Sequence, residues 1–264
     1  MTAKDAVSFL AGNRRTVLLG GMAVILHGLS RSTKDYDIWL DPLPEPEAWA
    51  GAIKELMALD AAFRVQRIDP ALSGHWLPIG KEEIAGVGTE DGLVRLAGID
   101  RPIDVFYLPN ELEISDFEGV WERSTAIEHG LRLIEKVDLI VTKQLTDRPI
   151  DRTDVAYLSE KVAEEYQRQL ANCSEAEAKE LFGRFATPEL AAFAYRESQN
   201  AKVRELGWRM LEEMRTAGDP FAAELIAELG LGHRDPPRPS NSFWHESPRR
   251  GRANEKDRGP ELDP

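Results

Sequence analysis

Two aspartates in the stretch KDYDIWL can bind one cation together. Asp35 and Asp37 are separated by one residue, and the polar–apolar alternation over residues 35–40 predicts a β-strand. Residues two apart in a strand project from the same face, so the two carboxylates are roughly 7 Å apart at the backbone. Mg²⁺ prefers such hard oxygen ligands, completed by water and substrate phosphates. For so short a motif, an exposed and solvated strand face is the alternative.

A pair of glycines lies upstream of these aspartates. Residues 16–19 predict a short buried strand, and Gly20-Gly21 ends it before an apolar helical run over residues 22–26. Backbone N–H groups at a glycine turn can approach an anion closely, so this turn can cradle a phosphate. An ordinary strand-to-helix turn is the alternative, and the chain has neither a Walker A nor a GxGxxG sequence.

A third carboxylate lies in a later strand-like run over residues 103–108. Asp104 is flanked by Ile103 and Val105, so it faces the opposite side of that strand from both. If this strand neighbours the one that carries Asp35 and Asp37, three acids meet, as metal-dependent nucleotidyl transfer requires. Exposure on an edge strand is the alternative.

Together these residues resemble a known family. The glycine pair, the D-x-D pair and the later strand aspartate are similar to the nucleotidyltransferase superfamily of DNA polymerase β-like fold. The string HG-x-x-R-x-T-x-D-x-D, from His27 to Asp37, narrows the resemblance to small bacterial proteins of the AbiEii and MenT type. The resemblance covers roughly residues 14–160 and implies an α+β fold with a mixed sheet. It implies that Asp35, Asp37 and Asp104 are catalytic and bind Mg²⁺.

A second block, KQLTDRPIDRTD, resembles the family's helical motif that closes over the nucleotide. The nucleotide-binding residues that the resemblance implies are Gly20, Gly21, Arg31, Thr33, Lys143, Arg148, Asp151 and Asp154. A lysine can pair with a triphosphate, and an aspartate can hold the lysine or the ribose. Charge on a helix surface with i,i+3 pairing is the alternative. Many members carry Gly-Ser in place of Gly20-Gly21, so this chain lacks that hydroxyl contact to phosphate.

The chain divides by composition into three parts. Residues 1–120 predict an α/β core, with an amphipathic helix from Pro46 to about Leu59 and further strands at 63–68 and 93–97. Residues 121–231 predict a helical region with one short strand near 131–134. Residues 232–264 are rich in proline and arginine and are expected to be a disordered tail.

Charge and composition exclude several classes of protein. The formal charge of -13 over 264 residues argues against binding of nucleic acid over a broad basic surface, although it allows one local basic pocket. The lone Cys173 cannot form an intrachain disulfide. The N-terminus lacks the apolar run of a signal peptide, and no stretch of about 18 apolar residues could span a bilayer. A cytoplasmic protein without a membrane partner is therefore expected.

The resulting expectation is a Mg²⁺-dependent nucleotidyltransferase. It would transfer NMP from an NTP to an acceptor hydroxyl on a tRNA end, a protein or a small molecule. The resemblance also suggests the toxin of a type IV-like toxin–antitoxin system, with a cognate antitoxin protein as partner. The alternative is a catalytically degenerate binding module of the same fold that acts through a protein partner. His27 follows an apolar helical run and is expected to be a buried or capping residue.

Overall fold

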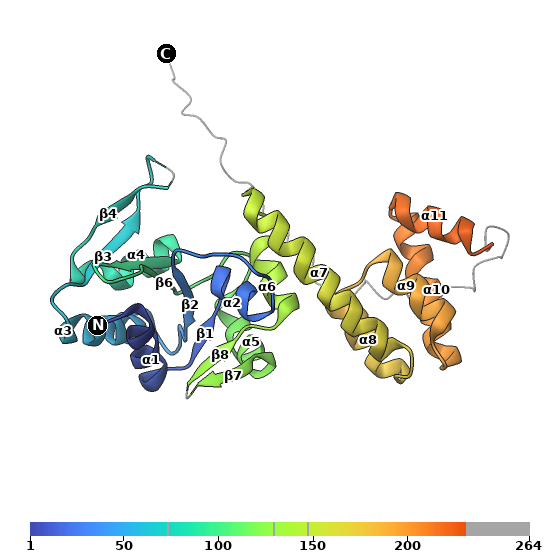
Figure 1. The fold of residues 1–264 in the computed structure, drawn as a ribbon, viewed down its shortest axis with the longest axis horizontal. Helices are drawn as coiled ribbons and strands as arrows, with labels where there is room; N and C mark the ends of the chain where they lie inside the picture. Colours follow the sequence, from blue (N-terminus) through green and yellow to red (C-terminus); the bar gives the residue numbers. More distant parts are fainter. Residues whose placement is uncertain (73, 129, 147, 231–264) are drawn as a thin grey trace, which may run out of the picture.

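The computed structural model describes residues 1–72, 74–128, 130–146 and 148–230, which fold into one mixed sheet and a set of helices (Figure 1). The strands are β1 (Thr16–Leu18), β2 (Tyr36–Leu40), β3 (Arg64–Ile68), β4 (Trp76–Pro78), β5 (Leu93–Ala97), β6 (Ile103–Phe106), β7 (Thr125–Glu128) and β8 (Leu131–Leu133). The α-helices are α1 (Ala3–Asn13), α2 (Gly20–Leu26), α3 (Pro46–Leu59), α4 (Ile84–Asp91), α5 (Phe117–Arg123), α6 (Lys136–Lys143), α7 (Pro149–Leu170), α8 (Glu175–Arg184), α9 (Pro188–Glu197), α10 (Ala201–Thr216) and α11 (Pro220–Glu228). The expected α+β class with a mixed sheet is confirmed.

The eight strands are ordered β4-β3-β5-β6-β2-β1-β8-β7. Strand β2 pairs antiparallel with β1 and parallel with β6, and the register places Asp37 opposite Asp104. On the other side of β6, the antiparallel strand β5 places Arg95 opposite Asp104. Because side chains of paired residues point to the same face of a sheet, Arg95, Asp104 and Asp37 form one row across three strands.

The two faces of the sheet pack on different helices. Leu18, Ile38 and Leu40 share a core with residues of α1, α3 and α4, among which Trp49 is fully buried. On the opposite face, the fully buried Trp39 makes an edge-on contact with Phe117 of α5 at 5.0 Å between ring centroids. This second core continues without a break into helices α6 to α11. The Asp37 row lies on the same face as Trp39.

The long helix α7 connects the sheet to the C-terminal helices, and Figure 1 shows it running from the sheet toward α8 to α11. Its N-terminal turn lies next to α6, with which it packs closely. Pro149 occupies the first turn of α7, where its missing N–H group leaves no intrahelical bond unmade. In the described part of the chain, no helix is both long and apolar enough to cross a lipid bilayer.

Most elements expected from the sequence are present, with differences at their edges. The strand predicted over 35–40 begins at Tyr36, so Asp35 stands just before it. Strands β4 and β7 were not among the strands expected from the sequence. Because β8 pairs with β1, the sheet extends past the boundary expected at residue 120. The expected disordered tail at 232–264 lies outside the described residues.

Candidate active site

The residues singled out in the sequence line one cleft of about 780 Å³. Volumes of this size are typical of small-molecule sites. One wall comes from the glycine pair and the loop before β2, another from β5 and β6, and a third from α6 and the start of α7. The expected residues that line it are Gly20, Gly21, Arg31, Thr33, Asp35, Asp37, Asp104, Lys143, Arg148 and Asp151. Asp154 lies behind this wall and is fully buried.

The three aspartates meet because β2 and β6 are neighbours. Asp37 and Asp104 are paired residues of these parallel strands, and Asp35 extends the same face by one step toward the N-terminal side. The strand that carries Asp104 is thus a neighbour of the strand that carries Asp37, which was the condition for the three acids to meet. Asp35 keeps a side-chain exposure of 30%, whereas that of Asp104 is 10%. The cluster is therefore open to the cleft on the Asp35 side.

Gly20 makes room for Asp37. Its φ of 58° lies in the left-handed region, and a Cβ atom at this position would overlap the Asp37 carboxylate. The backbone N–H of Leu19 donates to the Asp37 carbonyl oxygen at 2.8 Å, which holds this turn against β2. The first glycine of the pair is therefore required by the acid cluster itself.

Gly21 makes room for two polar side chains of the loop before β2. A Cβ atom on Gly21 would lie 2.6 Å from Thr33 Oγ1 and 2.7 Å from Arg31 Nη2. Thr33 Oγ1 also donates to Asp35 Oδ1 at 3.1 Å. The space next to the second glycine thus contains a threonine hydroxyl and a guanidinium.

Burial and mutual repulsion disfavour the ionised form of the acid cluster. The pKa of Asp37 is raised to about 7. Burial is the largest cause, the Asp104 and Asp35 carboxylates add to it, and Lys143 and the Gly21 N–H oppose it. Burial, together with Asp35, also raises the pKa of Asp104, although Arg95 opposes this rise. A positive charge at this point would relieve both effects.

Arg95 supplies one such charge and was not singled out in the sequence. Its Nε and Nη2 atoms donate to Asp104 Oδ1 and Oδ2, each at 2.6 Å, and Nη2 also lies 3.3 Å from Asp35 Oδ2. Its guanidinium stacks on Trp76 of β4, with Cζ 4.0 Å from the ring centroid. Burial opposes the charge of Arg95, but Asp104 and Asp35 raise its pKa overall.

Lys143 anchors a second, buried charge network at the junction of α6 and α7. Its Nζ lies 2.6 Å from Asp151 Oδ1 and 3.0 Å from Asp154 Oδ2, and its side chain is only 6% exposed. Arg31 Nη2 donates to the same Asp154 oxygen at 2.8 Å, which ties the loop before β2 to α7. Asp154 Oδ1 and Arg31 Nε are buried without a hydrogen-bond partner.

Asp151, which is buried in the wall of the cleft, accepts hydrogen bonds from three donors. Besides Lys143, Thr146 Oγ1 donates at 2.8 Å and Arg148 Nε at 2.5 Å to its Oδ2. Burial would raise the pKa of Asp151, but these three partners lower it overall. The Arg148 side chain is 72% exposed, so the rest of its guanidinium faces the open cleft.

His27 has the structural role expected from the sequence. It is the C-terminal cap residue of α2, and its Nε2 lies 2.8 Å from the Ile134 carbonyl oxygen. Burial lowers its pKa, so the neutral ring that donates to this carbonyl is favoured. We therefore assign it no catalytic role.

The donor set fits a divalent cation on Asp35 and Asp37. Both are hard oxygen donors that line the cleft. The pKa of Asp37 is raised first by burial and then by the Asp104 and Asp35 carboxylates, whose repulsion a cation would offset. Within the described ranges, no group of three or more His, Cys, Asp or Glu side chains is arranged to hold a metal ion. The fit therefore rests on two carboxylates and on open space that water and phosphates could fill.

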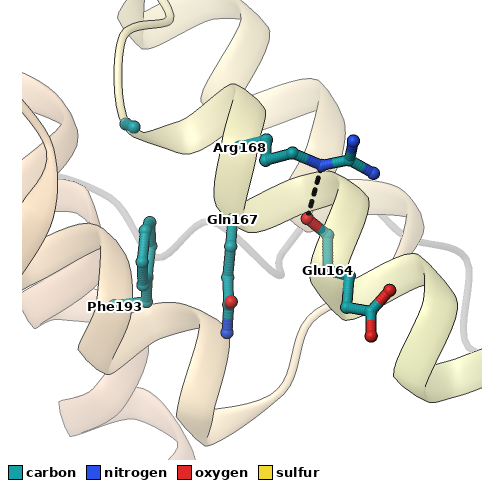
Figure 2. A pocket seen from close by; sticks show the side chains of 5 residues that line it. Glu164, Gln167, Arg168 and Phe193 are labelled. Atoms are coloured by element: carbon teal, nitrogen blue, oxygen red, sulfur yellow. Dashed lines mark hydrogen bonds between the residues drawn. The ribbon is translucent and has the colours of Figure 1, made fainter.

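A second concavity of about 680 Å³ lies on the helical region between α7 and α9 (Figure 2). It is lined by Glu164, Gln167, Arg168, Ala171 and Phe193. Arg168 lies along α7, where its Nε donates to the Glu164 carbonyl oxygen at 3.2 Å (Figure 2). None of the residues singled out in the sequence lies here, and we assign no chemistry to it.

Comparison of the chain with models of known protein families gives no match, and comparison with curated proteins also gives none.

Proposed function

We propose that the protein is a divalent-cation-dependent nucleotidyltransferase with a polymerase β-like core. The observation that carries the proposal is the convergence of Asp35, Asp37 and Asp104 on one face of the sheet, next to the glycine turn that adjoins Asp37. The unit β1–α2–β2, with an acid pair at the start of β2 and a third acid on the neighbouring β6, supports the finer fold assignment.

Asp35 and Asp37 are the proposed cation ligands. A divalent cation held there would neutralise charge on the nucleotide phosphates and draw electron density from the α-phosphorus. The chain contributes the preorganised position of both carboxylates, because the Gly20 turn and the β2–β6 pairing fix Asp37.

The cationic wall of the cleft is the proposed site of the triphosphate. Arg148 presents an exposed guanidinium there, and Lys143 and Arg31 lie beside it on the same cleft surface. Guanidinium groups form bidentate hydrogen bonds with phosphate oxygens. Asp151 positions both Lys143 and Arg148 and therefore shapes this wall.

In the proposed reaction, an acceptor hydroxyl oxygen bonds to the α-phosphorus of the NTP. The bond between this phosphorus and the oxygen that bridges to the β-phosphorus breaks, and pyrophosphate leaves with that electron pair. The acceptor proton passes to Asp104, whose pKa is raised by burial above the usual carboxyl value, which makes it a stronger base than an exposed aspartate. Leu93 and Phe106, which are paired on β5 and β6, form an apolar part of the cleft wall on the strands that carry Arg95 and Asp104.

The proposal is tested by transfer of a labelled nucleotide. The protein is incubated with Mg²⁺, a cell extract and each of four NTPs radiolabelled at the α-phosphate, and the products are separated on gels. Wild type and the control Glu90→Gln, whose side chain is 69% exposed, are expected to form the same labelled product. The double variant Asp35→Asn/Asp37→Asn is expected to form none. Equal labelling by this folded double variant would contradict the assignment.

A specific observation favours a second candidate function, a binding module without catalysis. Arg95 is already paired with Asp104, and Lys143 with Asp151 and Asp154, so these charges are balanced without a ligand. Calorimetry with each NTP, with and without Mg²⁺, separates the two functions. The enzyme is expected to bind at least one NTP in a Mg²⁺-dependent manner, whereas the module would bind none.

A further inference from the structure

Arg95 occupies the space between the carboxylates of Asp104 and Asp35. Asp37 and Asp104 are paired across neighbouring parallel strands, so their backbones are about 4.8 Å apart and their carboxylates can bridge one cation. Instead, both oxygens of Asp104 accept hydrogen bonds of 2.6 Å from the fork of Arg95. Bidentate, charge-assisted pairs of this kind are among the strongest in proteins.

The position of Arg95 is fixed from three sides. It sits on β5 opposite Asp104, its Nη2 also reaches Asp35 at 3.3 Å, and its guanidinium lies over the Trp76 ring. Its side chain is 18% exposed, and a guanidinium stays protonated at any physiological pH. The acid cluster therefore contains a permanent cation that belongs to the chain.

We propose that Arg95 is a specificity-determining residue that limits the site to one divalent cation, held by Asp35 and Asp37. Arg95 holds both oxygens of Asp104 and so keeps this carboxylate out of the coordination shell. Asp104, which the sequence analysis counted among the metal ligands, is thereby reassigned from metal ligand to partner of Arg95. This inference rests on the proposed function, because it assumes the cation site on Asp35 and Asp37.

The number of bound Mn²⁺ ions tests the inference without measuring activity. Binding of Mn²⁺ alone to the full chain is followed by calorimetry and by the electron paramagnetic resonance signal of the free ion. Wild type is expected to bind one ion, and Arg95→Met, which keeps the length of the side chain but removes its charge, is expected to bind two. Arg67→Met is the matched control, because Arg67 of β3 forms a comparable bidentate pair with Asp91 at the end of α4. This control is expected to bind one.

A double variant that leaves the net charge unchanged tests the inference if Arg95→Met does not fold. Arg95→Met/Asp104→Asn removes both members of the pair, so it leaves no uncompensated charge. It is expected to bind one Mn²⁺ with an affinity close to that of wild type, because both proposed ligands, Asp35 and Asp37, are unchanged.

The possible results distinguish failure of the role proposed for Arg95 from failure of the proposed function. Two ions on wild type, one ion on folded Arg95→Met, or a tenfold loss in the double variant would overturn the role of Arg95 and leave the cation site in place. Absence of Mn²⁺ binding by wild type would overturn the proposed function and this inference together.

Discussion

The backbone of Gly20 touches the side chain of Asp37 so closely that no Cβ atom fits between them. Gly20 has a positive φ and also makes this contact with Asp37. A side chain at this position would therefore disturb both the turn and the acid cluster. A strand-to-helix turn alone would accept other residues, whereas this one cannot accept a side chain without moving Asp37.

Gly20→Ala is therefore expected to displace Asp37. The left-handed backbone costs a non-glycine residue about 1–2 kcal/mol, and the overlap with the carboxylate adds to this cost. Urea unfolding should report the loss of stability, and calorimetry should report loss of Mn²⁺ binding. The control Gly12→Ala lies in α1 with open space around it, so it is expected to be neutral or stabilising by about 1 kcal/mol. Equal behaviour of the two variants would refute the role of Gly20.

Cation binding is expected to strengthen with pH because Asp37 must lose its proton to become a ligand. With its pKa at about 7, the apparent affinity for Mn²⁺ should be about tenfold lower at pH 6 than at pH 8. Titrations at both values measure this ratio. Asp37→Asn should bind Mn²⁺ weakly and without this dependence. A wild-type affinity that is flat between pH 6 and pH 8 would count against the prediction.

The raised pKa of Asp37 also makes the stability of the metal-free protein depend on pH. Stability is expected to fall as the pH rises, whereas cation binding strengthens. The pKa of Asp37 is raised on folding from 3.8, so the folded chain holds this proton more tightly than the unfolded chain. The contribution of Asp37 to stability is present below pH 3.8 and is lost as the pH rises toward 7. Asp37→Asn should remove this contribution, so unfolding titrations of the two proteins should diverge as the pH rises. Parallel pH profiles would contradict the shift.

Lys143 is expected to be essential for folding as well as for nucleotide binding. Lys143→Met leaves Asp151 and Asp154 buried with less compensation, and breaking a buried pair from one side typically costs about 3–5 kcal/mol. Lys161→Met breaks an exposed pair with Glu164 and should cost less than about 1 kcal/mol. Chemical denaturation of both variants measures the difference. A Lys143 variant as stable as the Lys161 variant would show that the network is not buried in solution.

Arg148 is expected to act on the nucleotide and little on the fold. Because its side chain is mostly exposed, Arg148→Gln should change stability by less than about 1 kcal/mol. Loss of a charged hydrogen bond to phosphate should weaken NTP binding by about tenfold. Calorimetry with the NTP that wild type binds measures this change. The control Arg168→Gln lies farther along α7, outside the cleft, and should bind the NTP as wild type does.

The elements with strong hydrophobic periodicity could be predicted from the local sequence alone. The strand at 93–97 and the helix from Pro46 to Leu59 occur where alternation and helical spacing placed them. Strands β4 and β7 escaped prediction because they are short and mostly exposed, so their residues show no apolar alternation. Pairing with β3 and β8 supplies the backbone hydrogen bonds that define them.

Arg95 escaped prediction for a different reason. In LVRLA it reads as a charged residue on the outer face of a half-buried strand, which is the ordinary place for an arginine. Its importance comes from Asp104 on the next strand and Trp76 on β4, and neither neighbour is visible in a local window.

The sequence by itself determined two local features of the site: the glycine turn and the acid pair that leads into β2. Only the tertiary structure decided which charges meet. The parallel pairing of β2 with β6 brings Asp104 to Asp37, and the packing of α6 on α7 buries Lys143 between Asp151 and Asp154. These contacts depend on strand order and burial, which are set by the whole core and not by neighbouring residues along the chain.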